Sequence, residues 1–329
     1  GMTYRLRERD ERVYPQGELA RRTIGQVGDK GNYGVEYVLR DVLEGRDGKA
    51  RRQRIARGFY GRVVGGDNSE PEDGLDVVTT LDLEMQDVAD RALRRQLEAQ
   101  NALWGTALVM EVATGDLLAM ANLSRTKSGA YAEVKNHALS SRMEPGSTFK
   151  LAALLALVDD AGMSLDETFD TGNGARVKVG RTTVQDSHGL PPLNLKDAVA
   201  HSSNVFFARA VYETYKDDPE RYVDYLRHLH LDRTVGLEEF GAVAPIFPAP
   251  GMKIWYPDVS IVNMGYGYAI ELTPLHTLTL YNAVANDGCM VAPRLVREIR
   301  RGGEVVERPE RRVLVDKICS SSALRKVRE

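Results

Sequence analysis

A serine and a lysine three residues apart, Ser147 and Lys150, are the side chains of this sequence whose types and spacing best suit covalent chemistry. Residues i and i+3 of a helix share a face, so the hydroxyl and the amine can meet. Residues 151–158, which follow directly, are all apolar, and such a helix belongs in a core. Because burial lowers the pKa of a lysine, its amine can take a serine proton. The spacing predicts a serine nucleophile with a lysine base, against the alternative of an ordinary serine at a helix N-terminus.

The same spacing occurs at Ser124 and Lys127, but in a polar segment where the lysine would stay solvated. A second polar cluster, His-Ser-Ser-Asn at residues 201–204, opens another mostly apolar segment. There the Ser202 hydroxyl could relay a proton, and the Asn204 carboxamide could hold a substrate amide. Serine and asparagine are also favoured helix N-caps, and taken alone this cluster is best interpreted as a cap.

Periodicity and turn residues predict the elements that must position these groups. Residues 1–72 have the composition of an irregular polar module, with a linker at residues 65–74. The later elements are a strand at 76–79, a helix capped by Thr80 or Asp82, a hairpin of residues 105–112 and 117–121, helices at 202–215, 219–228 and 273–286, and an extended segment at 291–300.

The bulk composition is that of a globular protein of 329 residues, long enough for two domains. A net charge of −3 and the lack of a long basic run with aromatics argue against nucleic-acid binding. Cys289 and Cys319 provide neither a disulfide framework nor a metal set, and no cofactor is expected. His228 and His230 lack a third ligand. Asp-Ser-His at residues 186–188 could seed a triad, but adjacent residues rarely converge on one atom, so we expect a loop near the active-site rim.

Ser-x-x-Lys at residues 147–150, followed by Ser-x-Asn at residues 202–204, resembles the penicillin-binding protein and serine β-lactamase superfamily. Further segments resemble class B penicillin-binding proteins, and their sequences are most similar to the cell-division (septal) transpeptidase of the Bacteroidetes type. The segments are residues 12–17, 24–25 and 34–36 for the N-terminal pedestal, 79–82, 86 and 109–115 for the start of the transpeptidase domain, and 265–267, 273–275 and 285–288 after the Ser-x-Asn motif.

This resemblance implies a mixed α/β (α+β) fold similar to that of β-lactamases and transpeptidases. In such a fold an antiparallel sheet would be flanked by helices and joined to a helical subdomain. Residues 1–72 would be the C-terminal part of the pedestal module, and residues 73–329 the transpeptidase domain. The resemblance further implies the inner membrane as location, with this region in the periplasm and the anchor outside these residues. No stretch of about 18 apolar residues and no signal peptide is present in the sequence.

The resemblance also implies a role for each site residue. Ser147 would attack the penultimate D-alanyl carbonyl of a peptidoglycan stem peptide, with its own N–H as one oxyanion donor, and Lys150 would take its proton. Ser202 would return a proton to the leaving D-alanine, while Asn204 and Thr148 would contact substrate. β-Lactam antibiotics would trap Ser147 as a slowly hydrolysed acyl-enzyme, and other cell-division membrane proteins would be partners.

One motif of the family is missing. A Lys-Thr/Ser-Gly triplet on an inner strand should follow the Ser-x-Asn motif by well over a hundred residues. The sequence reaches residue 329 in what looks like the helix before that strand, and Lys-Ser-Gly at residues 127–129 precedes Ser147 and is interpreted as coincidence. We therefore expect a truncated chain with impaired catalysis. The alternatives are a D,D-carboxypeptidase or β-lactamase of the same superfamily, or a scaffold that binds division partners.

Overall fold

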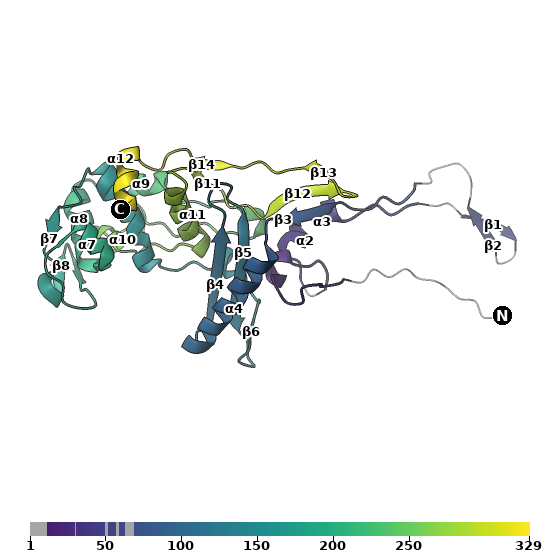
Figure 1. Ribbon diagram of the computed structural model, residues 1–329, viewed down its shortest axis with the longest axis horizontal. Helices are drawn as coiled ribbons and strands as arrows, with labels where there is room; N and C mark the ends of the chain where they lie inside the picture. Colours follow the sequence, from purple (N-terminus) through teal and green to yellow (C-terminus); the bar gives the residue numbers. More distant parts are fainter. Residues whose placement is uncertain (1–11, 30, 50–51, 57–58, 63–68) are drawn as a thin grey trace.

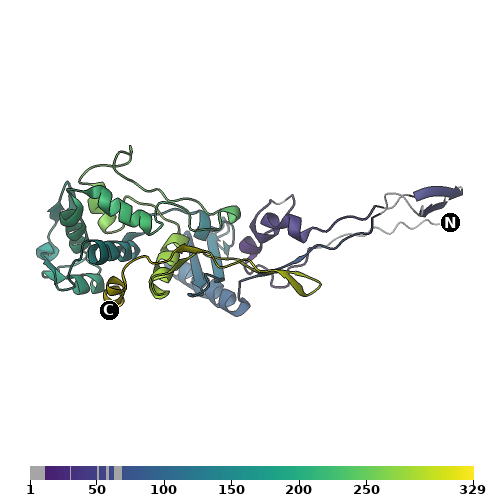
Figure 2. The same ribbon diagram turned by 90° about the horizontal axis from the view of Figure 1, so that it is seen from above.

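The computed structural model describes residues 12–29, 31–49, 52–56, 59–62 and 69–329. The molecule is elongated, with a helical region at one end, sheets in the middle and the N-terminal elements at the other end (Figures 1 and 2). Its sheets are antiparallel, which confirms the mixed α/β fold expected from the sequence. Among the described residues, no helix is long and apolar enough to cross a membrane.

The N-terminal elements are short, in keeping with a sequence rich in polar and turn residues. Part of the linker predicted at residues 65–74 lies outside the described residues, whereas Ser69 and Glu72 within it pair with Lys49 and Arg46. The division at residues 72 and 73 stays a prediction. The elements are α1 (Arg21–Ile24), α2 (Gly34–Val38), α3 (Arg40–Leu43), and the antiparallel pair β1 (Arg52–Ala56) and β2 (Phe59–Arg62).

A three-stranded antiparallel sheet, in the order β4–β5–β6, lies in the middle of the molecule (Figure 1). The predicted hairpin is confirmed, with its second strand longer than expected. Asp82 caps the helix that lies before this hairpin in the sequence, because its carboxylate accepts the Met85 N–H at 2.9 Å. That helix packs on the sheet where Ala89 meets Ala119 and Ala121. The elements are α4 (Leu83–Gln100), β4 (Trp104–Met110), β5 (Leu117–Arg125) and β6 (Tyr131–Ala132).

The extended segment predicted at residues 291–300 is two strands in two different sheets. Pro293 interrupts it, because proline has no N–H to give to a ladder. One strand pairs with β14 and the other lies between β3 and β13, so the prediction of one continuous segment was wrong. The elements are β3 (Asp76–Thr79), α11 (Pro274–Ala285), β11 (Met290–Val291), β12 (Val296–Arg301), β13 (Glu304–Glu307) and β14 (Val313–Val315).

The helical region is built around α6 (Lys150–Leu155) and the π-helical turn η2 (Ala156–Asp160) that continues it. Ala152, Leu155 and Leu157 have no exposed surface, which confirms that this apolar helix belongs in the core. Aromatic side chains of the neighbouring helices, including Phe206 and Tyr222, are also fully buried there. Figure 1 shows these helices gathered at the end of the molecule opposite the N-terminus.

The remaining elements complete the helical region and its surroundings. They are α5 (His137–Ser140), η1 (Gly146–Phe149), α6 (Lys150–Leu155), η2 (Ala156–Asp160), β7 (Thr168–Phe169), η3 (Gly172–Gly174), β8 (Val177–Val179), β9 (Thr182–Val184), β10 (Leu193–Asn194), α7 (Leu195–Ala200), α8 (Asn204–Tyr215), α9 (Pro219–His228), η4 (Glu238–Phe240), α10 (Ser260–Gly265) and α12 (Ser321–Arg328).

Candidate active site

Ser147 lies on the 3₁₀ turn η1, directly before the buried helix α6. Gly146 before it has a φ of 56°, in the left-handed region that glycine adopts most readily. Ser147 is exposed, whereas Lys150 on the next turn is only 6% exposed. The Lys150 Nζ lies 3.2 Å from the Ser147 Oγ. The expected meeting of hydroxyl and amine is therefore present in the structure.

The turn before Ser147 is held by a second glycine, Gly267, far along the chain. The Gly146 N–H donates to the Gly267 carbonyl at 2.9 Å. A Cβ on Gly267, whose φ is 91°, would lie 1.9 Å from the Gly146 oxygen. Only glycine fits this close approach of two backbones. Next to it, Met143 and Leu272 exchange two backbone hydrogen bonds, at 3.0 and 2.9 Å.

The Lys150 amine faces oxygen acceptors from the segment that joins α7 to α8. It donates to Asn204 Oδ1 at 2.7 Å, to Ser202 Oγ at 3.0 Å, and to the Ser202 carbonyl. Burial lowers the pKa of Lys150 to about 8, and the negative charge of Asp186 acts in the opposite direction. An amine with this pKa is partly neutral near neutral pH, and its neutral form can accept a proton from Ser147.

The two serines of the Ser-Ser-Asn cluster have different roles, one as a helix cap and the other as a partner of Lys150. Ser203 is the N-cap of α8, because its Oγ accepts the Phe206 N–H at 3.0 Å. Ser202 before it has a left-handed φ of 53°, so the helix predicted from residue 202 begins at Asn204 instead. The cap expected from the sequence thus exists, and it leaves the side chains of Ser202 and Asn204 facing Lys150.

Thr148 is exposed beside the nucleophile, but its hydroxyl already has a partner. It donates to the Pro145 carbonyl at 2.7 Å, within the turn that leads to Ser147. The Thr148 carbonyl accepts a hydrogen bond from the Tyr281 hydroxyl at 3.1 Å. In this structure the side chain closes its own turn, and a contact between Thr148 and substrate stays a prediction.

Asp186 was missed by sequence reasoning, which placed it on a loop at the rim of the site. The structure buries this carboxylate, at 7% exposure, against the segment that carries Ser202. Ser187 and His188 are exposed and hydrogen bond each other at 3.0 Å, so the three neighbours do not converge as a triad. No periodicity links an aspartate to a helix that begins so far along the chain, so only a hydrogen-bonding map reveals it.

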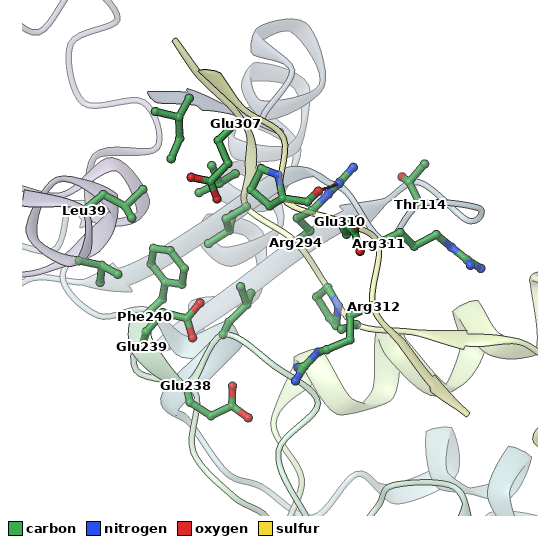
Figure 3. Close-up of a pocket in the computed structure, with 18 residues that line it drawn as sticks. Leu39, Thr114, Glu238, Glu239, Phe240, Arg294, Glu307, Glu310, Arg311 and Arg312 are labelled. Carbon is green, nitrogen blue, oxygen red and sulfur yellow. Dashed lines mark hydrogen bonds between the residues drawn. The ribbon is translucent and has the colours of Figure 1, made fainter. Parts of the chain in front are cut away.

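Other features weighed from the sequence lie apart from this cluster. Lys127 and Gly129 are exposed in the connection between β5 and β6, as expected for a coincidental Lys-Ser-Gly triplet. A cavity of about 410 Å³ lies between the N-terminal helices and the β12–β14 region. Figure 3 shows this cavity bounded by Leu39, Phe240 and Arg312. The residues that line it do not include Ser147, Lys150, Ser202 or Asn204.

Comparison with known proteins gives this geometry a family. A model described as the penicillin binding protein transpeptidase domain matches residues 105–329. Penicillin-binding protein PbpB of Mycobacterium tuberculosis is 30% identical over 305 residues, which are 88% of this chain and 43% of that protein. The probable peptidoglycan D,D-transpeptidase PenA of Neisseria meningitidis is 27% identical over 292 residues, covering 85% of this chain and 48% of PenA. The chain spans about half the length of these curated relatives.

Solved structures agree. Penicillin binding protein 3 from Mycobacterium tuberculosis, complexed with aztreonam, is 26% identical with a TM-score of 0.78, over 96% of this chain and 67% of that one. Penicillin binding protein 2X from Streptococcus thermophilus, at 21% identity, shares the fold with a TM-score of 0.77, over 96% of this chain and 48% of that one. With the family match across most of its length, the chain belongs to the penicillin-binding protein transpeptidase-domain family, in its class B branch.

Proposed function

We propose that this chain carries the nucleophile, base and proton relay of a serine D,D-transpeptidase that cross-links peptidoglycan stem peptides. The observation that carries the proposal is the position of one buried amine. Lys150 Nζ lies within hydrogen-bond distance of Ser147 Oγ, Ser202 Oγ and Asn204 Oδ1. The curated relatives PenA and FtsI (the latter from Caulobacter vibrioides, 26% identical over the whole chain and half of FtsI) are named as probable peptidoglycan D,D-transpeptidases, which supports this substrate class.

In the acylation step, the Ser147 Oγ bonds to the carbonyl carbon of the penultimate D-alanine while the neutral Lys150 amine takes the Ser147 proton. The Ser147 N–H, at the start of η1, is one donor to the oxyanion that forms. As the carbon–nitrogen bond breaks, Ser202 gives its proton to the leaving D-alanine nitrogen and recovers one from Lys150. The amine of a second stem peptide then attacks the ester, forms the cross-link and frees Ser147.

Asn204 is the proposed contact for the peptide. Its Oδ1 is engaged with Lys150, so the NH₂ group of the same carboxamide is the part left to donate to a substrate carbonyl. Asn204 is half-buried and Ser202 is exposed, which gives a peptide access to both.

β-Lactams are proposed as acylating inhibitors of Ser147. The Mycobacterium tuberculosis relative has been solved as complexes with aztreonam and with ampicillin, which supports the same ligand class here. In the native cell we propose a septal protein at the inner membrane, with this region in the periplasm and division proteins as partners. The Bacteroidetes type stays a prediction.

The test is the intact mass of the protein after incubation with benzylpenicillin, beside a Ser147→Ala variant. We expect one adduct per chain that the variant lacks. The 329 residues hold no Lys-Thr/Ser-Gly triplet after Asn204. Because the loss of one oxyanion donor costs about 10²- to 10³-fold, we expect faster acylation in a longer chain, extended past residue 329 by a strand with this triplet.

Each other outcome of this test has a clear meaning. No adduct on either folded chain would reject the acylating site and favour the scaffold alternative. Adduct formation followed by rapid release of hydrolysed penicillin would favour a β-lactamase. Incubation of the longer chain with a stem peptide separates the remaining activities, since a carboxypeptidase releases D-alanine without forming a cross-linked dimer.

A further inference from the structure

We propose that Asp186 is a positioning residue of this site, whose buried carboxylate fixes the segment that carries Ser202 and Asn204 against Lys150. The inference deepens the proposed function and rests on it. The hydrogen bonds of Asp186 go to Ser203, Asn204 and Val205 and not to Ser147, so its effect on the nucleophile must pass through the groups that it holds.

The carboxylate of Asp186 occupies the start of α8. Its Oδ2 accepts the Ser203 hydroxyl at 2.8 Å, and its Oδ1 accepts the backbone N–H groups of Asn204 and, at 3.2 Å, of Val205. The Ser203 Oγ in turn accepts the Phe206 N–H. Side-chain oxygens therefore satisfy the first three N–H groups of α8, which have no partner inside the helix. A carboxylate is also the charge that a helix N-terminus favours.

The segment needs this support because of the backbone of Ser202. Its left-handed φ of 53° is one that residues with a side chain rarely adopt. From the α7 side it is held by the hydrogen bonds from Ser202 N to Val199 O and from Ser203 N to Ala198 O, each 3.0 Å. From the α8 side the support comes from Asp186. If the second support is lost, Ser202 can relax and withdraw its hydroxyl from Lys150.

The same carboxylate acts on Lys150 through its charge. The other groups that face the amine are uncharged: the hydroxyls of Ser147 and Ser202, the Asn204 carboxamide, and the Phe207 ring at 5.8 Å. His188 follows Asp186 in its loop, and His201 precedes Ser202, with 6.4 Å between their rings. Asp186 is the charged side chain that raises the pKa of Lys150 against the effect of burial.

Two variants of the protein separate geometry from charge. Asp186→Asn keeps the shape and an oxygen for the backbone N–H groups, while its NH₂ can donate to the Ser203 hydroxyl. Asp186→Ala removes both charge and contacts. Asp197→Asn is the matched control, since it removes one exposed negative charge from α7, just before the segment. Rates of acylation by benzylpenicillin are measured across pH, with thermal unfolding of each variant.

We expect Asp186→Asn to move the acid limb of the acylation profile to lower pH by about half a unit or more, because loss of a nearby negative charge lowers the pKa of a lysine. We expect Asp186→Ala to lose about tenfold or more in acylation rate at every pH, since a displaced group costs catalysis. Asp197→Asn should match the wild type. If Asp186 only stabilised the fold, its substitution would lower the fraction of folded protein without moving the pH midpoint of the acylation profile.

A second readout does not depend on catalysis. The ¹³Cε resonance of Lys150, assigned by its loss in a Lys150→Met variant, reports the pKa of this amine directly. Asp186→Asn should lower that pKa whether or not penicillin reacts, whereas absence of an adduct on wild type would reject only the proposed function. An Asp186→Ala variant that is folded and acylates at the wild-type rate would overturn the positioning role. An unchanged Lys150 pKa in Asp186→Asn, or an equal shift in Asp197→Asn, would overturn the effect of its charge.

Discussion

Ser147 and Lys150 lie on one continuous helical segment, η1 and α6, and most residues that follow Lys150 are buried in the core. Ser202 and Asn204, which face them, lie on either side of the N-cap of a different helix, α8, and depend on the left-handed backbone of Ser202 and on the distant carboxylate of Asp186. Ser147 and Lys150 form what we call the first wall of the site, and hydrophobic packing holds it in place. Ser202 and Asn204 form the second wall, which is held by a few hydrogen bonds, each of which is individually weak.

This difference shows where the site is open to change. A polar wall that rests on hydrogen bonds can be moved by one substitution, whereas the apolar helix must be repacked. Lys150 is the link between the two walls, because its amine reaches both. The following predictions test that contrast, from the largest expected effect to the smallest.

Replacing Lys150 by methionine should lower the rate of acylation by about 10³-fold, since a general base contributes about 10²- to 10⁴-fold. The melting temperature should not fall, because the substitution removes a buried charge that is costly to desolvate. Stopped-flow acylation and thermal unfolding measure the two effects. Lys127→Met, in the other Ser-x-x-Lys copy, is exposed and should change neither. A Lys150→Met protein that acylates within tenfold of wild type would contradict the proposed base.

Replacing Gly267 by alanine should lower the free energy of unfolding by about 3 kcal/mol. The cost has two sources, the left-handed backbone at this position and a clash of the new Cβ with the Gly146 oxygen in the first wall. Gly251→Ala is the matched control, with a φ of 84° and nothing within 4 Å of its added Cβ. It should cost about 1 kcal/mol. Urea unfolding compares the two variants. Equal losses would show that the close approach to Gly146 is unimportant.

The pH dependence of acylation should follow the protonation of Lys150. The amine must be neutral to accept a proton, and its pKa is lowered to about 8. The rate should therefore reach a plateau above this value and fall as pH decreases, by about a hundredfold at pH 6 relative to the plateau. Acylation by benzylpenicillin across this range checks the profile. A rate that stays level between pH 6 and 9 would remove Lys150 from the role of base.

Thr148→Val should have the smallest effect. It removes the hydrogen bond from the Thr148 hydroxyl to the Pro145 carbonyl, which is worth about 1 kcal/mol. Because the hydroxyl is turned toward its own backbone, acylation should change by less than about fivefold, a loss that falls within about 1 kcal/mol. Thermal unfolding and acylation rates measure both effects. A much larger loss of acylation with unchanged stability would instead support Thr148 as a contact for substrate.

Much of the fold follows from local patterns in the sequence. The hairpin of β4 and β5, the Asp82 cap and the start of α9 at Pro219 are where apolar runs around a turn, capping and proline position predict them. The segment at residues 291–300 was misjudged, because apolar alternation continues through Pro293 although the pairing partner changes there. Which strands pair is a long-range property that one strand's own pattern does not contain.

The sequence by itself determined the spacing of Ser147 and Lys150, the apolar helix behind them and the order of the two motifs, because helical periodicity acts over a few residues. Only the tertiary structure decided that Ser203 caps α8 while Ser202 faces Lys150, that Gly267 presses on Gly146, and that Asp186 holds the second wall. It also decided how far burial lowers the pKa of Lys150, to about 8. Contacts between segments distant in the sequence arise only when the chain is packed, so no local pattern encodes them.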